Sequence, residues 1–230
     1  MVAETPQVQR ATTQAACSTP GPFEEVAKES YYYVTPPDPQ WPPERTESYL
    51  RFFNRYALPL ISAHEVYPGH FVHLIALRQV GGTPLARLLR PGAVTTEGWA
   101  HYIEQVMIEA GYGEEEPRFE LMQLREALLR LCRYLVSFGI HLDGWSFEEA
   151  TAFFQREGYA TPVIAEREAR RGVTGPNYYA YTLGKHEILA LRERYRAAKG
   201  GDFRLQEFHD RFIRLPYPVG IIQQLMLAQE

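Results

Sequence analysis

The segment from Ser62 to His70 constrains this chain more than any other. It reads Ser-Ala-His-Glu-Val-Tyr-Pro-Gly-His, so two histidines and a glutamate stand close together. In zinc hydrolases, two histidines on one helical face bind the metal, and a glutamate beside the first takes a proton from the attacking water. The segment therefore predicts a zinc site in which His64 and His70 are ligands and Glu65 is the general base.

The spacing of the two histidines excludes a regular helix through this segment. The usual pattern places the second histidine at i+4, but here that position is Pro68 and His70 stands at i+6. On an ideal helix the two side chains would point to different sides. A proline removes a helical hydrogen bond, and a glycine tolerates almost any backbone conformation. We therefore expect a break or bulge at residues 67–69 that turns His70 back towards His64. The alternative is two separate helices whose histidines make ordinary polar contacts.

A second acidic segment, Thr-Thr-Glu-Gly-Trp-Ala-His-Tyr-Ile-Glu, occupies residues 95–104. Its threonines suit a helix N-cap, which would place Glu97 in the first turn. In one large class of zinc peptidases a glutamate from a later helix is the third ligand, and Glu97 fits that role. Gly98 would let another backbone approach closely, and Glu104 could accept a hydrogen bond from a ligand histidine. The alternative for both glutamates is a solvated helix face.

Composition limits the kind of metal site and the partners. The only cysteines, Cys17 and Cys132, are too few for a thiolate zinc site, so histidine and carboxylate must hold any metal. A net charge of -4 without a basic cluster gives no reason to expect nucleic acid or an anionic membrane as partner. Residues 1–10 lack a signal-peptide core, and we expect a cytoplasmic location. The preference for arginine over lysine is compatible with a thermophilic source.

Hydrophobic periodicity predicts an all-α fold of many irregularly arranged helices. Residues 1–45 form an extended, proline-rich arm with one plausible strand at Tyr31–Val34, and residues 46–230 form the helical domain. Gly81 and Gly82 would end the helix that follows His70. A long helix is expected at residues 116–137. Its apolar stripe comprises Leu121, Leu124, Leu128, Leu131 and Leu135.

Two further groups are candidates for the chemistry. His141 follows Gly139 just beyond the long helix, and the tyrosines 178, 179 and 181 lead into another helix. A phenol and an imidazole that face the metal would stabilise the oxyanion of a tetrahedral intermediate. The alternatives are a surface or capping role for His141, and core packing with a satisfied hydroxyl for the tyrosines.

Four motifs in order, HEVYPGH, EGWAHYIE, GIHLDGW and YAYTLGK, give the chain a resemblance to a known family. Together they resemble the bacterial family called domain of unknown function 885, whose members are regarded as helical, zinc-dependent, gluzincin-like peptidases. The resemblance runs from about residue 57 to the C-terminus, with a weaker likeness in the N-terminal arm, and corresponds to the C-terminal catalytic half of longer members. It implies metal ligands at His64, His70 and Glu97, a general base at Glu65, and binding of substrate or oxyanion by His141 and Tyr181.

The chain also departs from the pattern of the family it resembles. His73 stands where glutamine is usual and adds a competing ligand, and Ser137 stands where aspartate is common. Members of the family are usually much longer, with a helical N-terminal half. Because residues 47–56 carry much aromatic surface, we expect a homodimer or association with such a half.

These observations lead to one function and its competitors. We expect a zinc-dependent metallohydrolase that cleaves peptide bonds, or related amide bonds, with a metal-activated water. The main alternative is a non-catalytic helical domain, derived from a metallopeptidase, that acts in binding or assembly. A di-iron bundle is a third reading because Glu97 and His101 lie one turn apart, but it requires paired Glu-x-x-His motifs that the sequence lacks.

Overall fold

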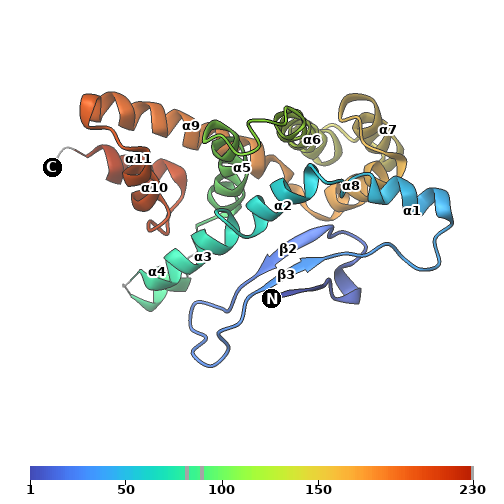
Figure 1. Ribbon diagram of the computed structural model, residues 1–230, viewed down its shortest axis with the longest axis horizontal. Helices are drawn as coiled ribbons and strands as arrows, with labels where there is room; N and C mark the ends of the chain where they lie inside the picture. The colour runs from blue at the N-terminus through green and yellow to red at the C-terminus, as the bar shows by residue number, and fades with distance from the viewer. Residues whose placement is uncertain (81–82, 89–90, 229–230) are drawn as a thin grey trace.

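Helices make up most of the molecule, as expected, and the arm forms a small sheet against them (Figure 1). The computed structural model describes residues 1–80, 83–88 and 91–228. The helix end expected at residues 81–82 lies outside the described residues. The α-helices are α1 (Pro43–Leu50), α2 (Ala57–Glu65), α3 (His70–Gln79), α4 (Pro84–Leu88), α5 (Ala93–Glu109), α6 (Arg118–His141), α7 (Phe147–Glu157), α8 (Pro162–Thr174), α9 (Ala180–Lys199), α10 (Leu205–Phe212) and α11 (Val219–Leu227).

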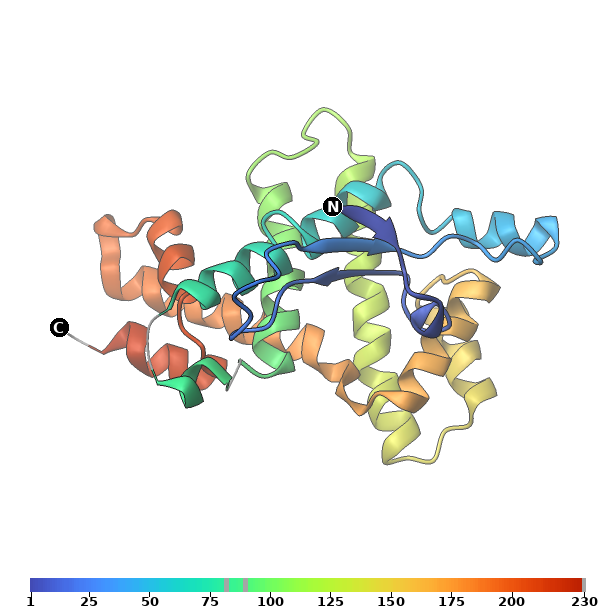
Figure 2. The same cartoon turned by 90° about the horizontal axis from the view of Figure 1, so that it is seen from below.

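The arm contributes three strands in the order β1-β3-β2. They are β1 (Val2–Glu4), β2 (Ala15–Ser18) and β3 (Tyr31–Val34), and β3 confirms the predicted strand. β2 runs antiparallel to β3, and the Thr35 N–H donates to the Gln14 carbonyl at 2.9 Å. Because such bonds alternate along an antiparallel pair, the main-chain groups of Ala15 and Cys17 face away from β3. This free edge lies against α2 and α3, as the view from below shows (Figure 2).

Two hydrophobic cores hold the helices together. The first joins α1, α2, α6, α7 and α8 around Tyr49, Phe154 and Ile164. The second joins α5, α9, α10 and α11 around Trp99, Ile188 and Phe208. Since α2 belongs to the first core and α5 to the second, side chains between these two helices lie where the cores meet.

α5 and α9 cross with their backbones in direct contact. A Cβ atom built on Gly98 would lie 2.5 Å from the Cα of Gly184, and one built on Gly184 would lie 1.8 Å from the carbonyl oxygen of Val94. No side chain fits at either position. The close approach predicted for Gly98 is therefore confirmed, and it fixes the part of α5 that carries Glu97.

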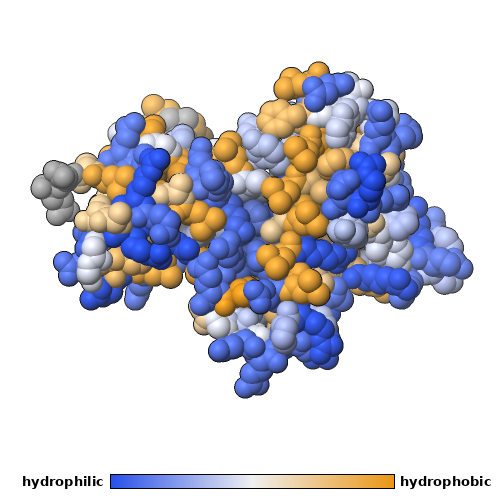
Figure 3. All heavy atoms as spheres, turned by 90° about the horizontal axis from the view of Figure 1, so that it is seen from above, coloured by the Kyte–Doolittle hydropathy of each residue, from blue (hydrophilic) through white to orange (hydrophobic). Residues whose placement is uncertain are grey.

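The apolar stripe of α6 faces outward, although the stripe of an amphipathic helix normally packs on the core. Leu121 is 65% exposed and Leu135 is 53% exposed, whereas Glu126, Arg130 and Arg133 on the opposite face are buried. Figure 3 shows the resulting band of hydrophobic surface over this helix. α6 also continues to His141, beyond the predicted end at residue 137.

None of the helices among the described residues has both the length and the apolar character of a membrane span.

Candidate metal centre

The chain breaks between α2 and α3, as the spacing of the histidines predicted. α2 ends at Glu65, and α3 begins at His70 after a cis Tyr67–Pro68 peptide. The Gly69 N–H donates to the carbonyl of Ala63 at 2.9 Å, which folds the chain tightly over the end of α2. A Cβ at residue 69 would lie 1.8 Å from the His64 carbonyl oxygen. Only glycine fits here, and the fold brings His70 back beside His64.

His64, His70 and Glu97 come together at the resulting junction. One ligand atom from each lies within 4.8 Å of the others. The Glu97 Oε2 is 3.6 Å from the His64 Nε2 and 3.2 Å from the His70 Nε2. Glu97 reaches this position from the second turn of α5, because the helix begins at Ala93 and not at the predicted threonine cap.

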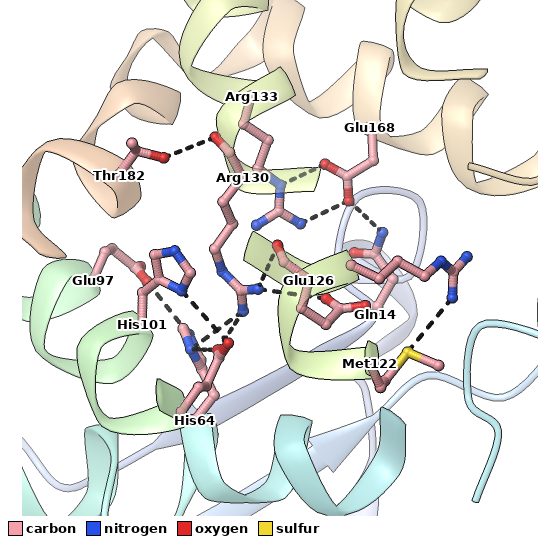
Figure 4. A network of polar contacts seen from close by, with 12 residues as sticks. Gln14, His64, Glu97, His101, Met122, Glu126, Arg130, Arg133, Glu168 and Thr182 are labelled. Carbon is pink, nitrogen blue, oxygen red and sulfur yellow. Dashed lines mark hydrogen bonds and ion pairs between the residues drawn. The ribbon is translucent and has the colours of Figure 1, made fainter. Parts of the chain in front are cut away.

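A buried network orients the first of these histidines (Figure 4). The His64 Nδ1 lies 2.7 Å from the Glu104 Oε1, and the Arg130 guanidinium donates to the same oxygen at 2.7 Å. A carboxylate accepts both bonds, so in the neutral form of His64 the Nδ1 carries the proton and the Nε2 presents its lone pair to the cluster. The role expected for Glu104, as acceptor from a ligand histidine, agrees with this geometry.

The electrostatics of the cluster fit a bound cation. Burial alone would lower the pKa of His64, but the hydrogen bond to Glu104 and the nearby carboxylate of Glu97 outweigh it and raise this pKa to about 9. Burial would raise the pKa of Glu97, yet His70 and His64 hold it well below its usual range. The Glu97 Oε2 is buried without a hydrogen-bond partner in the described structure. Two imidazoles and one carboxylate suit a catalytic zinc site.

A cavity of about 240 Å³ opens beside the cluster. Glu65 lines it, and its Oε2 accepts a hydrogen bond of 2.8 Å from the backbone N–H of Cys17 on the free edge of β2. The arm therefore forms one wall of the cavity and places the carboxylate of Glu65 next to the three ligand residues.

Tyr181 occupies another wall of the same cavity. Its ring stacks near that of His64, with 6.3 Å between centroids, and its hydroxyl accepts a hydrogen bond of 2.6 Å from Arg171. Burial, with Glu97 nearby, raises the pKa of Tyr181, so the phenol stays neutral. Since Arg171 occupies an acceptor position, the hydroxyl proton remains free to be donated into the cavity.

The other histidines considered from the sequence lie elsewhere. His141 is exposed at the end of α6, where its Nε2 lies 3.0 Å from the Gly172 carbonyl, and it does not line the cavity. His73 is fully buried, near Trp99, and burial lowers its pKa to about 3. His101 contacts Glu104 at 3.5 Å and stands outside the cluster of three. The structure thus brings Glu65 and Tyr181 to the cavity beside His64, His70 and Glu97, but not His141.

Sequence reasoning assigned no role at the site to several of its residues. The backbone of Cys17 and the side chains of Glu126, Arg130 and Arg171 line the cavity. Long-range packing places all four, and no spacing in the sequence relates them to the histidines. The apolar stripe of α6 was the available signal, because the face opposite it carries Glu126 and Arg130.

The family model described as bacterial protein of unknown function (DUF885) matches residues 1–226. The chain belongs to this family. The DUF885 match includes the arm, where the motifs indicated only a weaker likeness. None of the curated proteins matches the chain.

Two solved structures have the same fold over nearly the whole chain. One is described as "a putative lipoprotein of unknown function" from Shewanella oneidensis, with a TM-score of 0.82 and 35% identity; the alignment covers 99% of this chain and 40% of that one. The other is described as "the putative lipoprotein" from Colwellia psychrerythraea, with a TM-score of 0.81, 26% identity and coverages of 98% and 37%. This DUF885 chain therefore spans well under half of these relatives.

These descriptions correct the expected cytoplasmic location. Both similar structures are described as lipoproteins, a class of protein that a lipid attaches to membranes. The cytoplasmic prediction, which rested on the missing signal-peptide core in residues 1–10, is wrong. The start of a chain that spans 40% of a relative carries no information about a leader.

Proposed function

We propose that this chain is the catalytic part of a zinc-dependent hydrolase that cleaves peptide or related amide bonds. The observation that carries the proposal is the convergence of His64, His70 and Glu97 on one point, with Glu65 beside them in one cavity. A non-catalytic binding domain would have no need for a carboxylate held at the mouth of such a cluster. The break at Gly69 and the contact at Gly98 further support a site that the fold is built to hold.

Different residues of the cavity would have different roles in amide-bond hydrolysis. Zinc, when bound by His64, His70 and Glu97, would polarise the scissile carbonyl and lower the pKa of a water. Glu65 takes the proton of the attacking water and delivers it to the leaving amine. The hydroxyl of Tyr181 donates a hydrogen bond to the negative charge that develops on the carbonyl oxygen. Peptides or small amides are accordingly the expected substrates.

Metal content tests the ligand set directly. The purified chain, dialysed against zinc, should hold close to one zinc per molecule, as measured by atomic emission. Replacement of His70 by alanine should lower the zinc affinity by more than the roughly 10–100-fold expected when an outer hydrogen-bond partner such as Glu104 is replaced by glutamine. Since a proton competes at His64, whose pKa is about 9 without metal, the affinity should weaken as the pH falls below that value.

His186→Ala is the matched control for this measurement, because His186 is exposed on α9 outside the cluster. Its zinc content should equal that of the wild type. A chain that binds no zinc at neutral pH, or one in which His70→Ala and His186→Ala bind equally well, would favour the non-catalytic domain.

The partner we propose is an amphipathic helix that covers the stripe of α6. The exposed apolar residues follow one another at alternating spacings of three and four, which is the pattern of a helix-packing seam. They are Leu121, Leu124, Leu131, Leu135, Phe138 and Leu142, with the partly buried Leu128 completing the repeat. The two solved relatives extend far beyond the region matched here, and that further chain is the source we assign to the helix.

Hydrogen exchange on the Shewanella protein can test this partner. The helix that aligns with α6 should exchange slowly in the whole protein and faster in the isolated segment that matches this chain. Light scattering on the present chain tests the competing occupant, a second copy. A defined dimer that dissociates in Leu131→Glu/Leu135→Glu, but not in the control Leu85→Glu on α4, would show that the stripe joins two copies.

A further inference from the structure

The three arginines that line the cavity differ in their ion pairs. Arg130 contacts Glu104 at 2.7 Å and Glu126 at 3.4 Å. Arg133 donates through its Nε and Nη2 to the two carboxylate oxygens of Glu168, both at 2.7 Å. The charges of these two arginines are therefore neutralised within the protein.

Arg171 is the exception. Its Nη2 donates to the Tyr181 hydroxyl, and its guanidinium carbon lies 5.5 Å from the ring of Tyr178 and 5.9 Å from that of Tyr181. Among the described residues, no carboxylate lies within ion-pair distance of it. A guanidinium has five N–H donors, and the phenol takes one of them. Glu168, the nearby carboxylate, already pairs with Arg133, and a partly buried cation that no carboxylate contacts directly favours an anion from outside the protein.

Tyr181 connects this cation to the metal cluster. The ring of Tyr181 lies 6.3 Å from the ring of His64 and 5.9 Å from the guanidinium carbon of Arg171. The distance from His64 to Arg171 cannot exceed the sum of these two. About three residues of extended peptide, at roughly 3.3–3.6 Å each, span such a distance. An anion on Arg171 would thus lie a few residues from the bond at the metal.

We propose that Arg171 binds a carboxylate of the substrate, and that this group is the C-terminal carboxylate of a peptide. Arginine holds a carboxylate through two parallel hydrogen bonds, and the phenol contact orients the fork for them. The enzyme then releases at most about three residues from the C-terminus. This inference rests on the proposed peptidase function and adds the class of substrate to it.

The first experiment compares three peptides with the zinc-loaded chain. They are N-acetyl-tetraalanine with a free carboxyl group, its C-terminal amide, and an amide whose last residue is glutamate. The wild type should cleave the free acid with a kcat/KM roughly 10–100-fold above that of the plain amide. Arg171→Gln, which can still hydrogen-bond to Tyr181, should lose this preference mainly through KM.

Arg170→Gln is the matched control. Arg170 neighbours Arg171 on α8, is exposed, pairs with Glu166 at 3.2 Å, and does not line the cavity. It should keep the full preference for the free acid. If Arg171 had a merely structural role, Arg171→Gln would lower kcat/KM for the acid and the amide by the same factor. If Arg171 binds the carboxylate, the substitution should make the two kcat/KM values nearly equal.

Calorimetric binding to the zinc-loaded Glu65→Gln variant separates this inference from the proposed function, since it requires no turnover. Tighter binding of the free acid, lost on adding Arg171→Gln, supports the carboxylate site even if no peptide is cleaved; the hydrolase proposal alone would then fail. Equal binding of acid and plain amide, or no binding of either, overturns the role of Arg171. Recognition of the glutamate amide alone keeps the carboxylate site but overturns the assignment to the C-terminus.

Discussion

Replacement of Glu65 by glutamine should lower kcat for peptide hydrolysis by roughly 100- to 10,000-fold, the usual contribution of a general base. Glutamine has nearly the same shape and can still accept the N–H of Cys17 through its amide oxygen, so the wall formed by β2 should remain in place. It cannot take a proton from water. Because Glu65 is not one of the three clustered ligand residues, zinc content should be unchanged.

Steady-state kinetics and metal analysis on the same preparation check this result. Glu115→Gln is the matched control, because Glu115 is exposed and does not line the cavity, and its kcat should equal that of the wild type. Full activity in Glu65→Gln would remove Glu65 from the mechanism. A joint loss of zinc and activity would instead assign it a structural part in the site.

Replacement of Gly98 by alanine should lower the free energy of unfolding by about 3 kcal/mol or more, the upper range for overpacking. The new Cβ would lie 2.5 Å from backbone atoms of Gly184, and a backbone cannot move aside as a side chain can. The better helix propensity of alanine, worth at most about 1 kcal/mol, does not offset this. For a chain of this size the midpoint of thermal unfolding should fall by roughly 6–12 °C. Separation of α5 from α9 would also displace the neighbouring Glu97, so zinc affinity should fall.

Thermal unfolding followed by circular dichroism, together with zinc titration, tests both parts. Gly220→Ala on α11 is the control, because a Cβ at that position meets no heavy atom within 4 Å. Its unfolding midpoint should stay within about 2 °C of the wild type, as expected for an unconstrained surface position. If Gly98→Ala were as stable as Gly220→Ala, the direct backbone contact would not hold α5 in place.

The sequence located the cluster of His64, His70 and Glu97 because its signal is local. The spacing of His64 and His70 around Pro68 and Gly69 excluded a continuous helix, and the donor types suited zinc. Glu97 and Glu104 followed from their position on one later helix. Each of these residues could be found because zinc binding requires a known type of side chain at a known spacing in the sequence.

The sequence could not predict which face of α6 is buried. Periodicity identifies two faces of a helix but not which one is buried, and the usual assignment takes the apolar face as internal. Here Arg130 and Arg133 are buried because Glu104 and Glu168, from other helices, neutralise them. β2 was missed as well, since four residues with Ala15 and Cys17 among them carry little strand propensity. In both cases partners distant in the sequence decided the structure.

The polar network behind the metal cluster has a consequence for the order in which the chain folds. It ties Gln14 of the arm to Glu168 of α8, Arg133 of α6 to the same carboxylate, and Arg130 to Glu104 of α5. Contacts that join such widely separated residues form late, because the entropy cost of closing each long loop precedes the favourable free energy of the contact. A nascent chain that already contains His64, His70 and Glu97 would therefore have the three residues before the network that positions them has formed. If the chain binds zinc as proposed, full metal affinity would arise only after residues 168–181 have joined the fold.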